Sequence, residues 1–395
     1  MSGGVRPDRF TSRRGRVLGV DAARGVALVG MFATHILPLS DARGETPTGL
    51  LADGRSSALF AVLAGVGVAL TSGGTRPPPD GRTHLALAAA LVVRGVLVGL
   101  LGLWLAGLDP PAAVILAYYG LLFLVATPLL RLRAPVLAAG ALIACGLTPV
   151  LSHVLRAGLP AGPGDQAELT TLTQPAQLLV TLGLIGYYPV LTWTTYLLTG
   201  MAVGRLDLRR TDVAVWLLAG GTALATAAAA ASALLLGPGG GAAVLGSALQ
   251  RRRYGTTPTD TWWWLAADSP HSGTPLDLAH TTGTALAVLG AMLLVATAAR
   301  SLVVVPAALG AAPLTLYTLH VIALAAYPGG GDDLTLWITH ILVATAIGGL
   351  LVMAGRRGPL EAVVSAAGRG TRRLLSRPEA PREDRTPGTA PGRTS

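Results

Sequence analysis

Ten long apolar stretches dominate the sequence, and each is close to the length that a helix needs to cross a lipid bilayer. A span requires about 20 apolar residues, because a helix rises about 1.5 Å per residue through a hydrocarbon core of about 30 Å. Inside lipid every backbone polar group must be satisfied within the protein, which favours helices. The sequence therefore predicts an all-α polytopic transmembrane helix bundle of about ten spans. Their approximate bounds are 17–38, 56–73, 84–107, 112–130, 134–155, 178–205, 212–236, 275–298, 302–326 and 333–355.

The composition agrees with a membrane protein. Only 13% of the residues are charged, against about 25% in soluble proteins, and the mean hydropathy is +0.57. All 30 basic residues are arginine, which together with abundant Ala, Gly and Leu indicates a GC-rich bacterial genome. The net charge of +10 lies in tails and short loops, so the expected partner is the lipid bilayer and no nucleic acid. The single cysteine, Cys145, excludes an internal disulfide.

The uneven distribution of arginine predicts the orientation. With the N-terminus inside, the inner loops and tails carry 22 arginines and the outer loops carry 6. The positive-inside rule then places both termini in the cytoplasm of a cell whose inner (plasma) membrane holds the protein. We expect a cytoplasmic N-terminal arm over 1–16, a transmembrane domain over 17–355 and a disordered basic cytoplasmic tail over 356–395. Such a tail can contact anionic lipid head groups.

The sixth apolar stretch, 178–205, is interrupted. Gly183, Gly186 and Pro189 fall within it, and each weakens a continuous helix. The sequence therefore predicts a broken or re-entrant helix at this place.

Charged residues lie well inside two predicted spans: Asp21 and Arg24 in the first and Arg94 in the third. A charge within a bilayer is unfavourable by several kcal/mol, so it tends to face the bundle interior and mark a site. Asp21 and Arg24 are three residues apart and can pair with each other or with Arg94. One interpretation is a structural ion-pair network. The other is an arginine that binds phosphate or carboxylate in a cavity open to the cytoplasm.

Histidines gather on the predicted outer side, which suits general-base chemistry near neutral pH. His84 alone lies at the cytoplasmic edge. His35 lies at the end of the first span, on the same helix face as Asp21. The two residues are roughly 20 Å apart along the helix axis, so they cannot form a catalytic dyad. His320 is either a catalytic group or a hydrogen-bonded contact between helices. The six histidines in or beside the outer half are His35, His153, His271, His280, His320 and His340.

A second candidate is the pair formed by Asp277 and His280, which are three residues apart. An aspartate that holds an imidazole in one tautomer is a general-base arrangement. Alternatively, Asp277 completes a helix start in which Thr274 is the N-cap and Pro275 the first residue. The neighbouring tryptophans, 262–264, form either an aromatic belt at the membrane surface or a platform for a sugar. No spacing typical of a metal site, a Walker loop or a dinucleotide site is present, so we expect no metal.

Several motifs in this chain resemble one family of membrane enzymes. The first motif resembles the opening segment of the heparan-alpha-glucosaminide N-acetyltransferase-like proteins, is similar to that of the YeiB-like membrane proteins and, more distantly, is similar to the acyltransferase-3 group. Together the matches extend over about residues 15 to 361. They are Arg16-x4-Asp21-x2-Arg24-Gly25-x-Ala27 in a helix that ends at His35, Leu59-Phe60-Ala61-Val62-Leu63-Ala64-Gly65-Val66-Gly67, Leu316-Tyr317-Thr318-Leu319-His320, and Arg357-Gly358-Pro359-Leu360-Glu361.

The resemblance implies transfer of an acetyl group from acetyl-CoA, through a histidine, to a small-molecule or glycan acceptor across the membrane. The animal enzyme has its histidine in the loop after the first span, whereas loop 39–55 holds none here. The catalytic candidates are therefore His35, His320 and His280, the last with Asp277. Asp21, Arg24 and Arg94 are the candidates for binding the donor or stabilising the bundle.

Two other classes remain open. Intramembrane charges and a broken sixth helix are also typical of a transporter or permease for a small solute. A membrane scaffold without catalysis is the third class. The acceptor and the oligomeric state stay open at this point.

Overall fold

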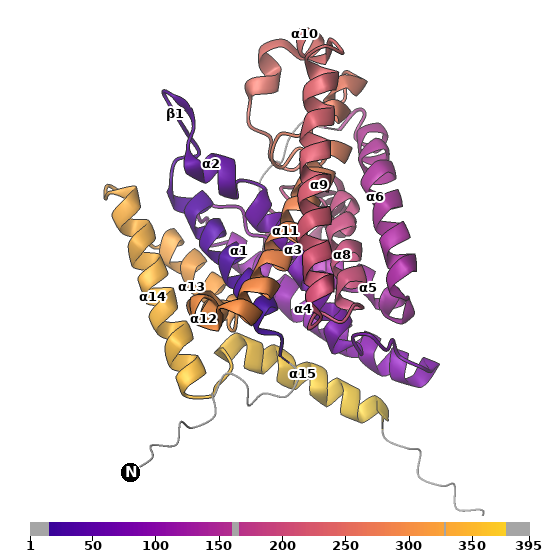
Figure 1. Ribbon diagram of the computed structural model, residues 1–395, viewed down its shortest axis with the longest axis vertical. Helices are drawn as coiled ribbons and strands as arrows, with labels where there is room; N and C mark the ends of the chain where they lie inside the picture. Colours follow the sequence, from indigo (N-terminus) through magenta and orange to yellow (C-terminus); the bar gives the residue numbers. More distant parts are fainter. Residues whose placement is uncertain (1–15, 160–165, 328, 377–395) are drawn as a thin grey trace, which may run out of the picture.

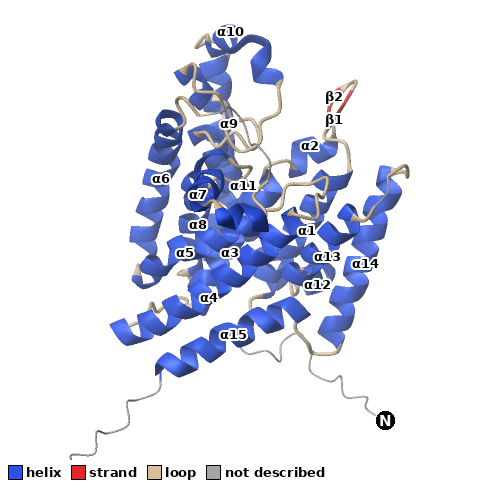
Figure 2. Cartoon of the chain, turned by 180° about the vertical axis from the view of Figure 1, so that it is seen from behind, coloured by secondary structure: helices blue, strands red, loops and turns tan. Residues whose placement is uncertain are grey.

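The chain folds into a bundle of helices with one very short hairpin, as Figures 1 and 2 show. The computed structural model describes residues 16–159, 166–327 and 329–376. The first half comprises α1 (Leu18–Ile36), the antiparallel strands β1 (Ser40–Asp41) and β2 (Gly44–Glu45), α2 (Pro47–Ala52), α3 (Arg55–Thr71), α4 (Gly81–Ala106), α5 (Leu116–Ala126), η1 (Thr127–Arg131), α6 (Ala134–Leu155), η2 (Leu169–Thr173), α7 (Pro175–Val180) and the π-helical η3 (Thr181–Ile185). The second half comprises α8 (Val190–Gly204), α9 (Thr211–Leu236), α10 (Gly241–Leu245), η4 (Gly246–Gln250), η5 (Trp262–Ala266), α11 (Pro275–Ala298), α12 (Arg300–Leu309), α13 (Pro313–Ala325), α14 (Asp333–Met353) and α15 (Pro359–Ser376).

Most of the long helices run between two ends of the molecule (Figure 1). One end carries α2, the hairpin and α10, and is called the α10 end below. At the other end, α15 lies across the ends of the other helices, and this is called the α15 end.

The predicted all-α polytopic bundle is confirmed, and the protein is a multi-pass membrane protein. Each of the ten predicted stretches contains at least one helix. By length and composition, six helices among the described residues can cross a membrane, or eight if each of two bent pairs counts as one span. Two predicted spans fall outside that count: α1, which carries two charges, and α5, which is short.

The predicted break in the sixth stretch is confirmed. The segments Pro175–Ile185 and Val190–Gly204 meet at 61°, after the π-helical turn η3. The Tyr118 hydroxyl accepts a hydrogen bond from the Tyr187 backbone N–H at 3.2 Å and so satisfies a donor that the break exposes. A Cβ on Gly186 would collide with this hydroxyl. A second bend, of 58°, separates α12 from α13 and was not predicted.

The disordered tail expected over 356–395 is wrong for residues 359–376, which form α15. The search for apolar runs missed this helix because it is amphipathic, with apolar side chains on one side only. Val363 and Leu374 are exposed apolar residues of α15. Residues 377–395, like 1–15 of the expected N-terminal arm, lie outside the described residues.

Helices approach closely where glycine meets backbone, as expected for a bundle with 51 glycines. Gly65 of α3 and Gly200 of α8 face each other, and a Cβ on either would overlap the partner helix's backbone. Gly25 of α1 and Gly310, just after α12, have the same relation. These contacts hold α1, α3, α8 and α12 close together around the residues described below.

Arg205, directly after α8, ties together three chain segments at the α15 end. Its Nη1 donates to the carbonyls of Ala69 and Gly74, each at 3.0 Å. Its Nη2 donates to the Ser72 hydroxyl at 3.1 Å and to the Leu130 carbonyl at 2.5 Å. The side chain is buried, so its charge is stabilised by these four hydrogen bonds.

We predict that Arg205→Met lowers the free energy of unfolding by about 2–5 kcal/mol, since it removes the four hydrogen bonds that a buried guanidinium group makes to two other segments. The measurement is thermal or denaturant unfolding of the detergent-solubilised protein. The matched control is Arg209→Met, whose side chain is exposed and which should change stability by no more than about 0.5 kcal/mol. Equal effects of the two substitutions would contradict the assigned role.

Candidate functional site

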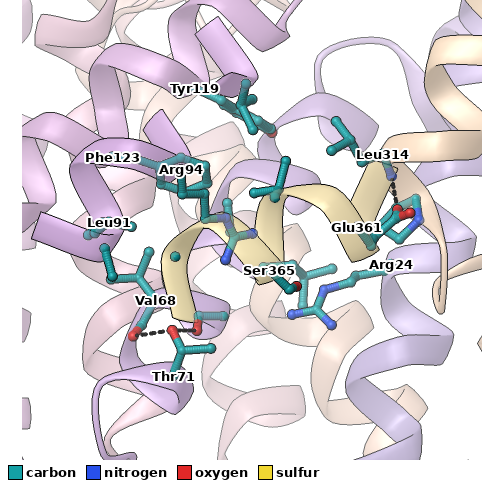
Figure 3. Close-up of a pocket in the computed structure, with 18 of the residues that line it drawn as sticks. Arg24, Val68, Thr71, Leu91, Arg94, Tyr119, Phe123, Leu314, Glu361 and Ser365 are labelled. Atoms are coloured by element: carbon teal, nitrogen blue, oxygen red, sulfur yellow. Dashed lines mark hydrogen bonds between the residues drawn. The ribbon is translucent and has the colours of Figure 1, made fainter. Parts of the chain in front are cut away.

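A cavity of about 550 Å³ opens near the α15 end between α1, α3, α4, α5, α13 and α15 (Figure 3). Along α3 its lining residues extend from Thr71 to Phe60. Eleven residues of helix correspond to about 16 Å, which is roughly half of a 30 Å hydrocarbon core. The cavity therefore reaches from one end of the bundle toward its middle.

The cavity is strongly cationic. Figure 3 shows the guanidinium groups of Arg24 and Arg94 entering it from different walls, and the two charges interact electrostatically. Glu361 is the single carboxylate among its lining residues. The cavity is lined by apolar side chains together with an excess of guanidinium groups. Such a lining is suited to bind an anion to which arginine can donate paired hydrogen bonds. The arginines that line it are Arg16, Arg24, Arg94, Arg357, Arg369 and Arg372.

The predicted pairing of Asp21 with Arg24 is confirmed, and Arg16 joins it. Arg24 Nη1 lies 3.0 Å from Asp21 Oδ1, and Arg16 Nε lies 2.8 Å from Asp21 Oδ2. Asp21 is buried, and both of its oxygens are occupied by these two arginines. The carboxylate thus fixes the two guanidinium groups at the wall of the cavity.

Arg94 has a different environment. Its guanidinium carbon lies 4.8 Å from the centroid of the Phe123 ring, which is a cation–π contact. Within the described ranges, no carboxylate lies within 4.0 Å of this guanidinium group. The predicted alternative of an Asp21–Arg94 pair is therefore not formed, and the charge of Arg94 faces the cavity.

Glu361 anchors α15 to the start of α13. Its Oε1 accepts hydrogen bonds from the backbone N–H groups of Leu314 at 2.7 Å and Thr315 at 3.1 Å. Its Oε2 accepts one from the Thr315 hydroxyl at 2.6 Å. The carboxylate is thus used as a helix cap, where the helix dipole favours negative charge. Gly358 is required nearby because a Cβ there would collide with Glu361, which explains the Gly-Pro-Leu-Glu motif.

We predict that Glu361→Ala detaches α15 from α13, because the substitution exposes unpaired donors at a helix start; the loss is about 1–2 kcal/mol. Amide hydrogen exchange in α15 should accelerate by roughly tenfold or more. The control is Arg373→Ala on an exposed position of α15, which should leave the exchange unchanged. Unaltered protection in the Glu361 variant would contradict this cap.

Aromatic residues close the inner end of the cavity. Phe60 and Tyr119 stack with ring centroids 5.6 Å apart, and Tyr317 of α13 completes the wall. The Tyr317 hydroxyl accepts a hydrogen bond from the Ile115 N–H at 3.3 Å, which fixes the ring. The His35 ring lies edge-on to Tyr317, with centroids 6.3 Å apart. A single aromatic side chain therefore links the cavity to the histidines.

The structure brings two predicted histidines together. His35 Nδ1, at the end of α1, lies 3.1 Å from His320 Nε2 of α13. His320 Nδ1 in turn lies 2.7 Å from His340 Nδ1 of α14. Phe32 stacks on His320 with centroids 3.7 Å apart. Among the described residues no group of three or more His, Cys, Asp or Glu is arranged to hold a metal ion, so these contacts are hydrogen bonds between imidazoles.

The predicted dyad of Asp277 and His280 is wrong. His280 Nδ1 lies 3.3 Å from Asp268 Oδ2 instead. Burial alone would raise the pKa of Asp268, but the hydrogen bond and charge of His280 outweigh it and hold that pKa below its usual range. Asp277 follows the alternative, a helix start: its N–H donates to the Thr274 hydroxyl at 3.1 Å, and its Oδ2 accepts from the Gly273 N–H at 2.9 Å.

Sequence reasoning missed a polar cluster at the α10 end. Asp53, in the turn between α2 and α3, forms an ion pair with Arg252, and its Oδ1 lies 3.4 Å from His271 Nε2. His271 has a left-handed backbone with φ of 59°, which is a strained conformation for this residue. No spacing signal could reveal this cluster, since Asp53 and Arg252 lie 199 positions apart.

The neighbouring tryptophans divide into two kinds. Trp264 is buried and its indole N–H donates to Asp260 at 2.8 Å, while Arg253 lies 4.4 Å above its ring. Trp262 is exposed and stacks on His153. Trp264 therefore holds the 251–273 segment together, whereas Trp262 is exposed enough to meet lipid or sugar.

The protein is thus a polytopic helix bundle with an arginine-lined cavity near one end and hydrogen-bonded imidazoles beyond the inner end of that cavity. The family model of the heparan-alpha-glucosaminide N-acetyltransferase catalytic domain matches residues 16–235, and the chain belongs to this family. The matched segment includes four cavity walls, α1, α3, α4 and α5, together with His35. A search of curated proteins gave no match to the chain.

Proposed function

We propose that the protein is a membrane acyltransferase that moves an acetyl group from acetyl-CoA to a hydroxyl or amine of a sugar or envelope molecule at the external face. Family membership supports the acetyltransferase class. One observation carries the residue assignment: the arginine-lined cavity ends at Tyr317, whose ring adjoins His35. A donor that fills the cavity would place its far end beside that histidine.

The chemistry of acetyl-CoA suits this cavity. Its phosphates are anionic, and guanidinium groups bind phosphate oxygens through paired hydrogen bonds. Its long uncharged arm would lie between apolar side chains such as Leu63, Leu91 and Val98. The arginine excess at the α15 end supports a cytoplasmic location for this end of an inner-membrane protein, because positive charge favours that side.

His35 is the proposed catalytic group. Its Nε2 would take the proton of the acceptor O–H or N–H, which then attacks the thioester carbonyl; the C–S bond breaks and the CoA sulfur leaves. In a two-step version, Nε2 itself attacks the thioester and carries the acetyl group to the acceptor. In both versions His320 holds His35 in a fixed orientation through the bond to Nδ1.

The acceptor would approach from the α10 end, where Asp53, Arg252 and His271 lie. Their charged and hydrogen-bonding groups are suited to orient a hydroxylated molecule beside His35.

We predict that His35→Ala lowers acetyl transfer at least 100-fold, since general-base catalysis contributes roughly 10²–10⁴ in rate. The measurement uses purified protein in nanodiscs with acetyl-CoA labelled in the acetyl group, and follows free CoA and labelled product. His153→Ala, which alters a histidine stacked on Trp262, is the control and should retain transfer. Full activity of the His35 variant would remove it from the site.

We predict that Arg94→Gln weakens acetyl-CoA binding roughly 10- to 100-fold, because a charge-assisted hydrogen bond contributes about 1.5–3 kcal/mol. Calorimetry on the nanodisc protein gives Kd directly. The control is Arg209→Gln, an exposed arginine that does not line the cavity. Unchanged affinity in the Arg94 variant would contradict the assignment of the cavity to the donor.

Transport of a small solute is the second candidate function. Two helix pairs, α7–α8 and α12–α13, are bent by 61° and 58°, and broken helices in two halves of a bundle are typical of transporters. Uptake of labelled solute into proteoliposomes without any covalent product would favour transport. Donor turnover without uptake would favour the acyltransferase.

A further inference from the structure

Three imidazoles from three helices form one continuous hydrogen-bonded chain. His35 comes from the end of α1, His320 from the middle of α13 and His340 from the second turn of α14. The two nitrogen-to-nitrogen distances are 3.1 Å and 2.7 Å, both within hydrogen-bond range. His340 was not among the residues that the sequence singled out as catalytic candidates.

The tautomers in this chain are coupled. Each N···N contact needs one N–H and one lone pair, and a neutral imidazole has one of each. Both ring nitrogens of His320 are engaged, so the tautomer of His320 determines which nitrogens carry protons on His35 and His340. A proton that enters at one end can therefore leave at the other without rotation of any ring.

The middle imidazole of the hydrogen-bonded chain is more buried than the two imidazoles at its ends. His320 is 3% exposed, and the Phe32 ring covers it face to face at 3.7 Å. His35 and His340 are both only half-buried. His340 is seven residues into α14, or about 10 Å from the start of this helix at Asp333, which brings its ring toward the polar membrane surface of the α10 end.

We propose that His340 is a positioning residue that also carries protons, and that His35, His320 and His340 form a relay which removes the acceptor proton from the reaction centre. The proposal rests on the proposed acyl transfer at His35. In the resting state Nδ1 of His35 donates to His320 Nε2, and His320 Nδ1 donates to His340 Nδ1. This leaves His35 Nε2 with a lone pair that can act as the base.

The proton balance follows from that arrangement. When His35 Nε2 takes the acceptor proton, the Nδ1 proton of His35 moves to His320 Nε2, and the Nδ1 proton of His320 moves to His340 Nδ1. His340 then releases its Nε2 proton to water. Each ring gains one N–H bond and loses one, so no ring keeps a charge. After the CoA thiolate has formed, the protons move back along the same bonds: His340 Nε2 takes a proton from water and His35 Nε2 gives its proton to the thiolate sulfur, which restores the resting tautomers.

The test compares two substitutions of His340. Asn at position 340 can still form a hydrogen bond to His320 Nδ1, but an amide cannot accept a proton at one atom and release it from another. We expect His340→Asn to lower kcat for acetyl transfer roughly 10- to 100-fold while KM for acetyl-CoA stays unchanged. The kcat of His340→Ala should fall by a similar factor and should recover at least in part when imidazole is added.

Asn fills the space, so His340→Asn should gain nothing from imidazole, and this difference separates proton transfer from a packing defect. Thr339→Ala is the matched control, because Thr339 is the exposed neighbour on α14 and its hydroxyl donates to the Thr335 carbonyl within the same helix. It should retain the wild-type kcat.

The outcomes distinguish this proposal from the one it rests on. Wild-type kcat in His340→Asn, with a large loss in His35→Ala, would overturn the relay and leave acyl transfer at His35 intact. A loss in His340→Ala that imidazole never restores would also overturn the relay and leave a structural role. Absence of turnover in the unmodified protein, with acetyl-CoA and longer acyl-CoAs, would overturn both.

Discussion

Inside the apolar bundle Asp21 and Glu361 have partners for both carboxylate oxygens, whereas Arg94 has no acidic partner among the described residues. The site depends on this imbalance of charge. Asp21 uses both oxygens on Arg16 and Arg24, and Glu361 uses both on the start of α13. These two carboxylates are thus already engaged, while Arg94 faces the cavity beside the Phe123 ring and not beside an acid. Buried or half-buried guanidinium charge without a counter-ion is unfavourable. The proposed anionic donor, entering from the α15 end, would relieve this, and its binding would then stabilise the bundle.

The same packing places chemistry at the other end of the cavity. Close contacts at Gly25 and Gly65 bring α1 against α12 and α3 against α8, and α1 in turn presents His35 to His320. Tyr317 belongs to both regions, since it lines the cavity and also adjoins His35. The bundle thus separates an arginine-rich side from a histidine-rich side by one aromatic layer. The proposed transfer, from a donor at one face of the membrane to an acceptor at the other, needs such an arrangement.

The sequence was informative where the signal is local. Apolar length predicted the helices, Gly186 and Pro189 predicted the bend in the sixth stretch, and the three-residue spacing predicted the Asp21–Arg24 pair. The sequence was not informative where a contact with a residue elsewhere in the chain determines the structure. His280 pairs with Asp268 and not with Asp277, because a loop brings a second carboxylate within reach. The cluster at Asp53 and the imidazole chain depend on tertiary contacts alone, and α15 was missed because its pattern is amphipathic and not continuously apolar.

The most direct test is a cryo-electron microscopy structure of the protein in nanodiscs with an acetyl-CoA analogue whose thioester sulfur is replaced so that transfer cannot occur. The account predicts density for the phosphates beside Arg94 and the arginines of α15, an extended arm along α3 and α4, and the acetyl group at Tyr317, next to His35. Density that occupies the α10 end while the arginine-lined cavity stays empty would contradict it. So would a donor that lies in the cavity with its acetyl group pointing away from Tyr317.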